Sequence, residues 1–322
     1  MEYKRLTATG ITVSRLSLGT MEFGGRIPKD DAIRMTHFAL DSGVNFIDTA
    51  NVYQDGHSES VLGEALQGRR DDVVLATKVR LTRHPERLNS EGLNRRAIMR
   101  EIEGSLRRLK TDYIDVYYLH IPDPDTPIEE TVDTLGDLIR SGKIRYWGVS
   151  NFASWQLADI DACAVMRHVP RPVLSENVYN LLCRSAEPEL VPCLRAHKIG
   201  MTVFNPLAGG LLTGKHSFDK IVAGRFDGNK QYQDRYWNED SFRGVELLRP
   251  IAEDAGITLA DLSIKWCAQH DFVDSVLIGS TSMQHLESNL RALEGKPLSE
   301  ETLARCDEVW KQISDTRYQY NR

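Results

Sequence analysis

The chain has 322 residues, of which 41% are hydrophobic and 27% charged, and its formal net charge is −6. This length can bury a full core, in one large barrel or in two domains, and the acidic balance argues against nucleic-acid binding. No apolar run approaches the roughly 20 residues of a membrane span, and the first residues lack the apolar core of a signal peptide. We therefore expect a soluble, cytoplasmic protein with no nucleic-acid or membrane partner.

The first half of the chain alternates predicted strands and helices. A polar turn that ends at Gly10 separates two short extended runs, which predicts an N-terminal β-hairpin lying over one end of a barrel. Ser58 is a candidate cap for the second helix, which ends at Gly68. The predicted core elements are strand 16–19, helix 30–42, a strand ending at 48, helix 58–68, strand 73–78, helix 94–110, strand 114–120, helix 128–141 and strand 144–150.

The second half continues the same alternation. Its predicted elements are helix 155–167, strand 173–179, helix 190–197, strand 201–207, helix 242–254 and strand 275–279. Eight strands that alternate with helices, with no flexible linker between them, predict one (β/α)8 TIM barrel domain over residues 1–322. A further C-terminal helix is predicted over 300–313. The segment 208–241 is longer than ordinary strand-to-helix connections, which indicates a functional loop.

Titratable residues follow three successive predicted strands. Asp48 and then Tyr53 follow one, Lys78 ends the next and His120 ends the third. Taken singly, such residues are often helix caps, loop aromatics or surface groups. Chemistry in a parallel barrel collects at the carboxyl ends of the strands, so the four together predict a catalytic group.

Two other chemistries are disfavoured by the sequence. Residues 209–215 fit the start of a phosphate-binding loop, but His216 stands where the magnesium-binding Ser or Thr would be, and no G-x-G-x-x-G follows the first strand. The five cysteines are odd in number and show no CxxC pair, which indicates reduced thiols. His120 with Asp123 and Asp125 lacks a second histidine, so we expect no metal site.

The motifs together resemble the aldo-keto reductases over nearly the whole chain. The similarity is to bacterial members close to the potassium-channel β-subunit and aldehyde reductase branches. The segments that bear it are Leu18–Thr20, Asn45–Ala50 with Tyr53, Thr77–Lys78, Leu119–His120, Gly148–Phe152, Tyr179–Leu182 and Pro206–Leu212. By this resemblance, the family's catalytic tetrad falls on Asp48, Tyr53, Lys78 and His120.

Physical chemistry supports the roles that the resemblance implies. A phenol has an unperturbed pKa of about 10, so Tyr53 is a poor acid or base near pH 7 unless a cation favours its phenolate. Lys78 supplies a cation, and Asp48 would hold that ammonium by a charge-assisted hydrogen bond. His120 would orient a carbonyl oxygen or share in proton transfer.

The resemblance also implies a nicotinamide cofactor, with NADP(H) favoured over NAD(H). The implied cofactor-binding residues are Gly19, Thr20, Met21, Ser150, Asn151, Glu176, Phe204, Asn205, Pro206, Leu207, Ala208, Gly209, Lys215, Arg225, Gly279, Ser280, Thr281, His285 and Asn289. Within this set, Ser150 and Asn151 would hold the carboxamide, Phe204 would stack on the nicotinamide, and Lys215 with Arg225 would bind a 2′-phosphate.

Three positions depart from the family pattern. Glu176 stands where the family has Gln, His285 replaces a Gln or Arg, and Ser288 replaces a Glu. An ionised Glu176 beside the nicotinamide would favour NADP⁺ and the dehydrogenase direction, whereas a protonated or ion-paired Glu176 would not. Both states of Glu176 remain open at this point.

The predicted function is an NADP(H)-dependent oxidoreductase (EC 1.1.1.-) that moves hydride between nicotinamide and a small carbonyl or secondary alcohol, such as an aldehyde, ketone or sugar. One alternative is a cofactor-sensing regulatory subunit with slow turnover, and another is a barrel scaffold that binds no cofactor. The physiological substrate, reaction direction and oligomeric state stay open. The expected pocket wall comprises Met21, Phe23, Tyr53, Tyr117 or Tyr118, Tyr232, Tyr236 and Trp237.

Overall fold

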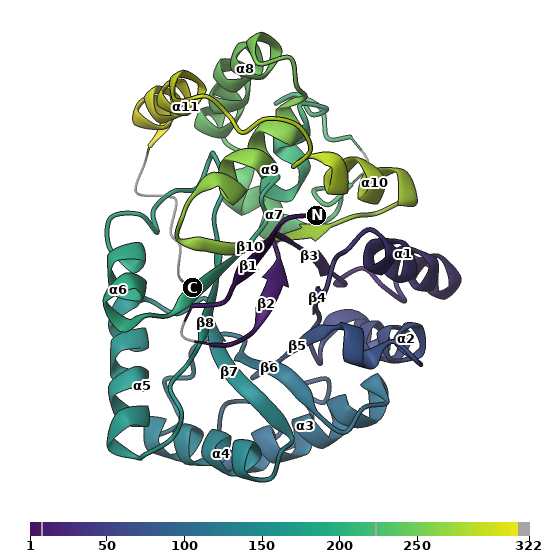
Figure 1. Cartoon of the computed structure of the whole chain (residues 1–322), viewed down its shortest axis with the longest axis vertical. Helices are drawn as coiled ribbons and strands as arrows, with labels where there is room; N and C mark the ends of the chain where they lie inside the picture. Colours follow the sequence, from purple (N-terminus) through teal and green to yellow (C-terminus); the bar gives the residue numbers. More distant parts are fainter. Residues whose placement is uncertain (8, 223, 315–322) are drawn as a thin grey trace.

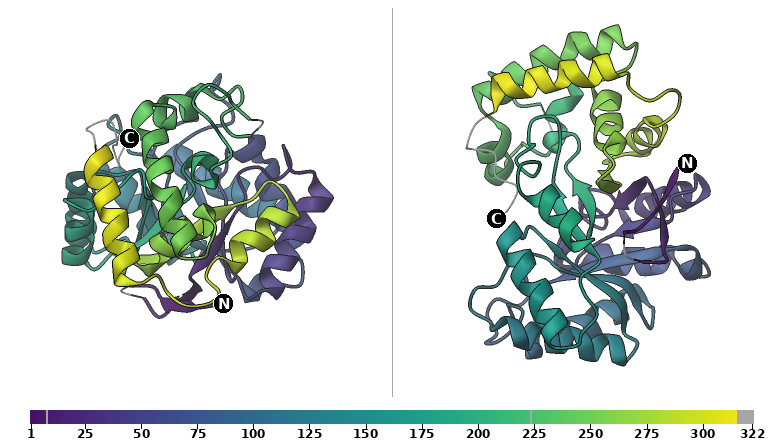
Figure 2. Two further views of the ribbon diagram at one scale, coloured as in Figure 1. Left: turned by 90° about the horizontal axis from the view of Figure 1, so that it is seen from above. Right: turned by 60° about the vertical axis from the view of Figure 1, so that its left-hand side comes forward.

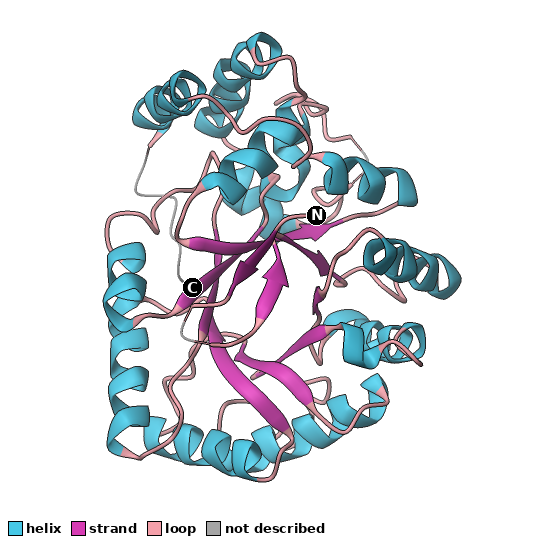
Figure 3. Cartoon of the chain, viewed as in Figure 1, coloured by secondary structure: helices cyan, strands magenta, loops and turns pink. Residues whose placement is uncertain are grey.

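A closed barrel of eight parallel strands forms the centre of the computed structural model, which describes residues 1–7, 9–222 and 224–314 (Figure 1; Figure 3). The order around the barrel is β10-β3-β4-β5-β6-β7-β8-β9. The strands are β3 Leu16–Gly19, β4 Phe46–Asp48, β5 Val74–Val79, β6 Ile114–Leu119, β7 Ile144–Ser150, β8 Leu174–Val178, β9 Gly200–Phe204 and β10 Val273–Gly279. The predicted (β/α)8 barrel is confirmed.

Helices surround the barrel because their apolar faces pack on the outer faces of the strands (Figure 2). In α3, for example, Ile98, Ile102 and Leu109 recur at helical spacing and are fully buried. The helices are α1 Lys29–Asp41, α2 His57–Ala65, α3 Arg95–Leu109, α4 Ile128–Arg140, α5 Ser154–Met166, α6 Leu190–His197, α7 Lys230–Tyr236, α8 Glu239–Asp254, α9 Leu259–Gln269, α10 Met283–Arg291 and α11 Glu300–Ile313. As predicted, α11 packs outside the barrel, beside α8 (Figure 2).

The predicted N-terminal hairpin closes the end of the barrel where the strands begin. β1 (Tyr3–Arg5) pairs antiparallel with β2 (Thr12–Ser14). Leu6 and Val13 are buried against Phe46 and other residues from inside the barrel. This end is therefore filled with apolar side chains, and the carboxyl ends of the strands are left for a cleft.

The second half of the fold contains helices that the sequence analysis missed. The 208–241 segment is not an open loop, because it holds the 3₁₀ helix η3 (Ala208–Thr213) and α7. The helix predicted over 242–254 begins earlier, at Glu239, and two further helices, α9 and α10, are present. Residues 262–268 of α9 are all buried. The helix therefore lacks the alternation of apolar and polar faces that reveals a surface helix in a sequence. The capping box at Thr258 is the local sequence signal that could have located the start of α9.

The predicted cap at Ser58 is wrong. Gly56, with φ of 83°, caps α2, and Ser58 lies inside the first turn of the helix. The Ser58 hydroxyl lies 2.7 Å from Thr20 O and 3.0 Å from Thr49 Oγ1. Ser58 therefore fastens α2 to the ends of β3 and β4. None of the described helices combines the length and apolar character needed to cross a membrane.

Candidate active site

A cleft of about 1310 Å³ opens at the carboxyl ends of the strands. Apart from Lys78 and Ala208, which are fully buried, all the predicted site residues line it. They are Gly19, Thr20, Met21, Asp48, Tyr53, His120, Ser150, Asn151, Glu176, Phe204, Asn205, Pro206, Leu207, Gly209, Lys215, Arg225, Gly279, Ser280, Thr281, His285 and Asn289. The barrel thus gathers residues from the whole length of the chain.

Lys78 lies beneath the floor of the cleft, with its side chain inaccessible to solvent. Its ammonium forms an ion pair with Asp48 Oδ1 and donates to Thr49 O at 3.0 Å. Burial by itself would lower the pKa of Lys78, but Asp48, Glu176 and Tyr53 together raise it. The lysine is therefore a permanent cation near neutral pH.

Glu176 is a second carboxyl group at the same ammonium. Its Oε1 lies 3.4 Å from Lys78 Nζ, and its side chain is only 5% exposed. Burial, and then the charge of Asp48, raise the pKa of Glu176 to about 8, although Lys78 opposes this. The structure therefore favours a protonated Glu176 at pH 7, and the expectation of an anion that attracts NADP⁺ loses its basis at that pH.

Tyr53 borders the cleft directly above Lys78. The ammonium lies 5.2 Å from the centroid of the Tyr53 ring. Burial raises the pKa of Tyr53, and Asp48 and Glu176 add to the rise, whereas Lys78 lowers it. Lys78 lowers the pKa of Tyr53, as expected from the sequence, but burial outweighs this effect. Tyr53 is therefore a protonated phenol across the neutral range.

His120 meets Tyr53 edge to face, with 5.9 Å between the ring centroids and an interplanar angle of 81°. Burial of the ring away from water, together with the nearby charge of Lys78, lowers the pKa of His120 to about 3. Its Nδ1 is buried and has no hydrogen-bond partner among the described residues. His120 is therefore neutral at the tip of β6 and can donate or accept a hydrogen bond without carrying charge.

The end of β7 contributes Ser150 and Asn151. Asn151 adopts φ of 61°, a left-handed conformation that asparagine tolerates. Its Nδ2 donates to His120 O and to Ser150 Oγ, both at 3.0 Å. These bonds hold the Asn151 side chain in one orientation. They also connect Ser150 and Asn151, the predicted carboxamide-binding pair, to the backbone of His120.

Asn205 and Arg225 meet in the middle of the cleft. Arg225 Nη1 approaches Asn205 Oδ1 at 3.4 Å and the Tyr232 hydroxyl at 3.3 Å, and Arg225 Nη2 lies 3.5 Å from Glu22 Oε1. Asn205 Nδ2 is buried without a partner in the part of the chain that the structure describes. Gly209 has φ of 69°, and a Cβ there would lie 2.8 Å from the Tyr232 ring, so only glycine fits.

The far end of the cleft is formed by the end of β10 and the start of α10. Ser282 caps α10, and His285 Nδ1 lies 3.0 Å from Thr281 Oγ1. Asn289 donates to Ser280 Oγ at 3.2 Å. Lys215 lines the cleft and is exposed. The end of β10 and the start of α10 therefore present hydroxyl groups, a helix N-terminus and the His285 ring.

Part of the expected pocket wall is wrong. Met21, Tyr53 and Tyr232 line the cleft, but Phe23, Tyr117, Tyr118, Tyr236 and Trp237 do not. Tyr118 faces the barrel interior, where its hydroxyl lies 3.3 Å from Thr202 Oγ1, and Tyr117 packs among the residues outside the strands. The apolar wall near Tyr53 is instead formed by Val52, Leu81 and Ile121, which follow three strand ends.

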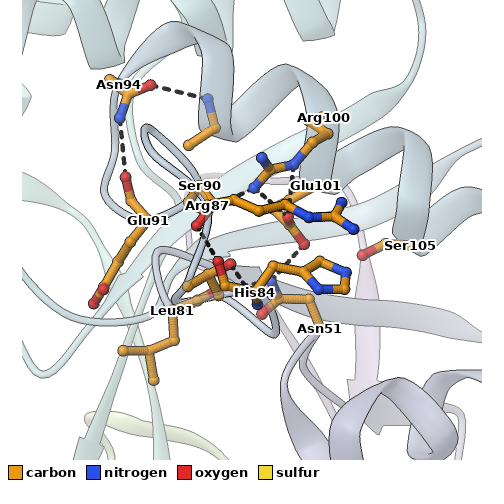
Figure 4. Close-up of polar contacts among 12 residues, drawn as sticks. Asn51, Leu81, His84, Arg87, Ser90, Glu91, Asn94, Arg100, Glu101 and Ser105 are labelled. Atoms are coloured by element: carbon orange, nitrogen blue, oxygen red, sulfur yellow. Dashed lines mark hydrogen bonds and ion pairs between the residues drawn. The ribbon is translucent and has the colours of Figure 1, made fainter.

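A buried hydrogen-bond network holds Leu81 in place (Figure 4). Asn51 Nδ2 donates to Leu81 O and to Glu101 Oε2, both at 2.9 Å. Glu101 also accepts from Arg100, whose Nη2 donates to Ser90 O at 2.7 Å. Glu101 on α3 thus connects the Tyr53 loop to the segment after β5. Sequence reasoning missed this network, because no motif marks Asn51 or Glu101.

No cluster of three or more histidine, cysteine or acidic residues suited to a metal occurs within residues 1–7, 9–222 and 224–314. The proximity of Lys78 to Asp48 and Glu176 explains why the two carboxyl groups converge. An ammonium already occupies the position between them.

Comparison with known proteins shows which family this barrel belongs to. The Aldo/keto reductase family profile matches residues 15–311. A protein from Oryza sativa subsp. japonica described as "Probable voltage-gated potassium channel subunit beta" is 38% identical over 306 residues, covering 92% of this chain and 93% of the relative. Human "Aldo-keto reductase family 7 member A3" is 34% identical, with 92% and 94% covered. Rat "Aflatoxin B1 aldehyde reductase member 2" is 33% identical, with 92% and 84% covered.

Proposed function

The chain belongs to the aldo/keto reductase family and is an oxidoreductase, and we propose that it transfers hydride between NADP(H) and a small carbonyl compound or secondary alcohol. The observation that carries the proposal is the convergence of Tyr53, Lys78, Asp48 and His120 at the floor of one cleft. We further propose that residues 1–322 act as one barrel domain in the cytoplasm.

Tyr53 is the proposed proton donor to a carbonyl oxygen, and the acceptor of that proton in the reverse direction. Its phenol is protonated at neutral pH, as a donor must be. Donation leaves a phenolate, and the ammonium of Lys78 beneath the ring stabilises that charge. Asp48 is the proposed anchor of the ammonium. The neutral ring of His120 would orient the carbonyl oxygen through a hydrogen bond.

Three features of the cleft support a dinucleotide cofactor. The cleft exceeds the size of pockets for single small ligands. Asn205 Nδ2 is a buried donor without a partner among the described residues, beside the glycine turn at Gly209 and Gly210. Lys215 and Arg225 supply positive charge for phosphates. When bound, NADP(H) supplies the hydride donor or acceptor, and Ser150, Asn151 and Phe204 are the proposed contacts of its nicotinamide.

The proposed substrate is a small aldehyde or ketone, or the corresponding alcohol. Val52, Leu81 and Ile121 give the cleft an apolar wall next to Tyr53, so an apolar substituent on the carbonyl carbon would be desolvated there. Two of the relatives bear names that include aldehyde or aldo-keto reductase, which agrees with this class of substrate.

A steady-state assay tests the proposal directly. NADPH consumption with a panel of aldehydes and ketones, and NADP⁺ reduction with alcohols and sugars, should reveal turnover that Tyr53→Phe lowers by at least about a hundredfold. Tight NADPH binding without turnover on any carbonyl would contradict the catalytic proposal. Failure of NADPH to quench tryptophan fluorescence would contradict the cofactor proposal.

A regulatory role is the second candidate, and the similarity to a protein named as a potassium channel subunit favours it. A cofactor-sensing subunit would bind NADP(H) and a protein partner while turning over slowly. Affinity purification of the tagged chain from its own cells, run beside the steady-state assay, separates the two functions. A stoichiometric partner together with negligible turnover would favour regulation.

A further inference from the structure

Three buried ionisable groups meet at the floor of the cleft, and their charges do not balance if all are ionised. Lys78 supplies one positive charge, whereas Asp48 and Glu176 would supply two negative charges. The side chains are 0%, 3% and 5% exposed, so water does not screen the excess charge. Burying an uncompensated carboxylate is costly, and a carboxyl group in such a site binds a proton instead.

The hydrogen bonds indicate where that proton lies. Asp48 Oδ1 is bound by Lys78, whereas Asp48 Oδ2 is buried and accepts no hydrogen bond from any donor group among the described residues. The two carboxyl groups are close enough to share a hydrogen bond, and such a bond would lower the pKa of Asp48 and raise that of Glu176. Lys78 is ion-paired directly with Asp48 and lies 3.4 Å from Glu176, so the cation keeps Asp48 ionised and leaves Glu176 as the carboxyl group that carries the proton.

We infer that Glu176 shares its proton with Asp48 Oδ2 and acts as a positioning residue that keeps the positive charge of Lys78 available to Tyr53. The inference rests on the proposed function for its catalytic consequence, but the location of the proton is independent of it. With one proton on the pair, the cluster of Lys78, Asp48 and Glu176 is neutral overall. When that proton leaves for solvent, the cluster becomes an anion.

The groups around Glu176 come from several elements of the barrel. Asp48 lies on β4, Lys78 on β5 and Tyr118 on β6, and Tyr53 follows β4. Lys78 is the cation among the groups that act on Glu176, and the phenols of Tyr53 and Tyr118 stay neutral. A negative cluster opposes a phenolate on Tyr53, so loss of the Glu176 proton should slow proton donation by Tyr53.

Two variants distinguish the effect of the Glu176 proton from that of the side-chain shape. Glu176→Gln keeps the shape and a hydrogen-bond donor, whereas Glu176→Leu removes the donor. The amide of glutamine donates to Asp48 Oδ2 at every pH, whereas leucine leaves that oxygen without a donor. Wild-type turnover should fall as the pH rises through about 8, and this break should be absent or displaced upward in Glu176→Gln. Glu176→Leu should also lack the break near pH 8, but it should shift the unfolding equilibrium toward the unfolded state by about tenfold or more, because one buried acceptor loses its donor. Glu187→Gln, outside the cleft, is the matched control and should keep the wild-type profile.

Infrared difference spectroscopy locates the proton without any assay. The spectrum of wild type minus Glu176→Gln at pH 7 should contain a protonated-carboxyl band that disappears above about pH 8. Absence of the band would overturn the inference, and so would a pH–turnover break that is unchanged in Glu176→Gln. If no carbonyl is reduced by any variant, the proposed function fails while the band still reports the location of the proton.

Discussion

The ammonium of Lys78 lies 5.2 Å from the centroid of the Tyr53 ring, although β5 holds the lysine and the tyrosine follows β4. The ion pair with Asp48 and the bond to Thr49 O fix the ammonium from below. The ammonium of Lys78 is therefore held beside the Tyr53 ring in the cleft. This arrangement has measurable consequences.

Replacing Tyr53 by Phe should lower turnover by roughly a hundredfold to ten-thousandfold, because a positioned general acid is lost. NADPH affinity should change little, since the substitution removes one oxygen. Single-turnover oxidation of bound NADPH by an aldehyde measures the chemical step. Tyr113→Phe, which does not line the cleft, is the control. A near-normal rate in Tyr53→Phe would contradict the assignment.

Replacing Lys78 by Met should destabilise the protein by about 3–5 kcal/mol, because it leaves Asp48 buried without its cation. Urea unfolding followed by tryptophan fluorescence measures the change in free energy of unfolding. Lys311→Met removes an exposed lysine paired with Glu308, and it should change stability little. Equal effects in the two variants would show that the buried pair adds nothing specific.

Arg225→Ala and Lys215→Ala should each weaken NADPH binding about tenfold or more, the worth of one charge-assisted hydrogen bond, and weaken NADH binding less. The reason is that only NADPH carries the 2′-phosphate. Fluorescence titration with both cofactors gives the two dissociation constants. Lys220→Ala, in the same segment but outside the cleft, is the control. Equal weakening for NADPH and NADH would show that neither side chain contacts the 2′-phosphate.

The lowered pKa of His120 should make the folded protein less stable in acid. Its pKa is lowered to about 3 in the fold, against about 6.5 in an unfolded chain. Between these values only the unfolded state binds the proton, so this contribution to stability is full above pH 7 and falls as the pH drops. Urea midpoints at pH 7 and pH 5 should differ less in His120→Asn than in wild type. The same difference in both proteins would contradict a neutral His120.

The alternation of strands and helices could be predicted from the sequence because each element has a local signal. Short apolar runs ended by polar residues gave the strands, and helical spacing with glycine at the end gave most helices. Topology then brought together Asp48, Lys78 and His120, since the ends of adjacent parallel strands must meet. The candidate site could be predicted for the same reason.

Tertiary structure alone decided which side chains reach the cleft. Tyr117 and Tyr118 are consecutive on β6, so they point to opposite faces, and the barrel register directs Tyr118 inward and below the cleft. The sequence alone could not show which of the two tyrosines points into the barrel. The network of Asn51 and Glu101 joins residues 50 apart and has no local signal.

The charge states were also beyond the sequence. It determined that Glu176 occupies an unusual position, but whether this carboxyl group is ionised depends on burial and on the distances to Lys78 and Asp48. The same holds for Tyr53, whose pKa rises with burial despite the nearby lysine. Residue types and their order along the chain determined the fold and the site, whereas desolvation and close contact, which exist only in the folded barrel, decided the protonation of its groups.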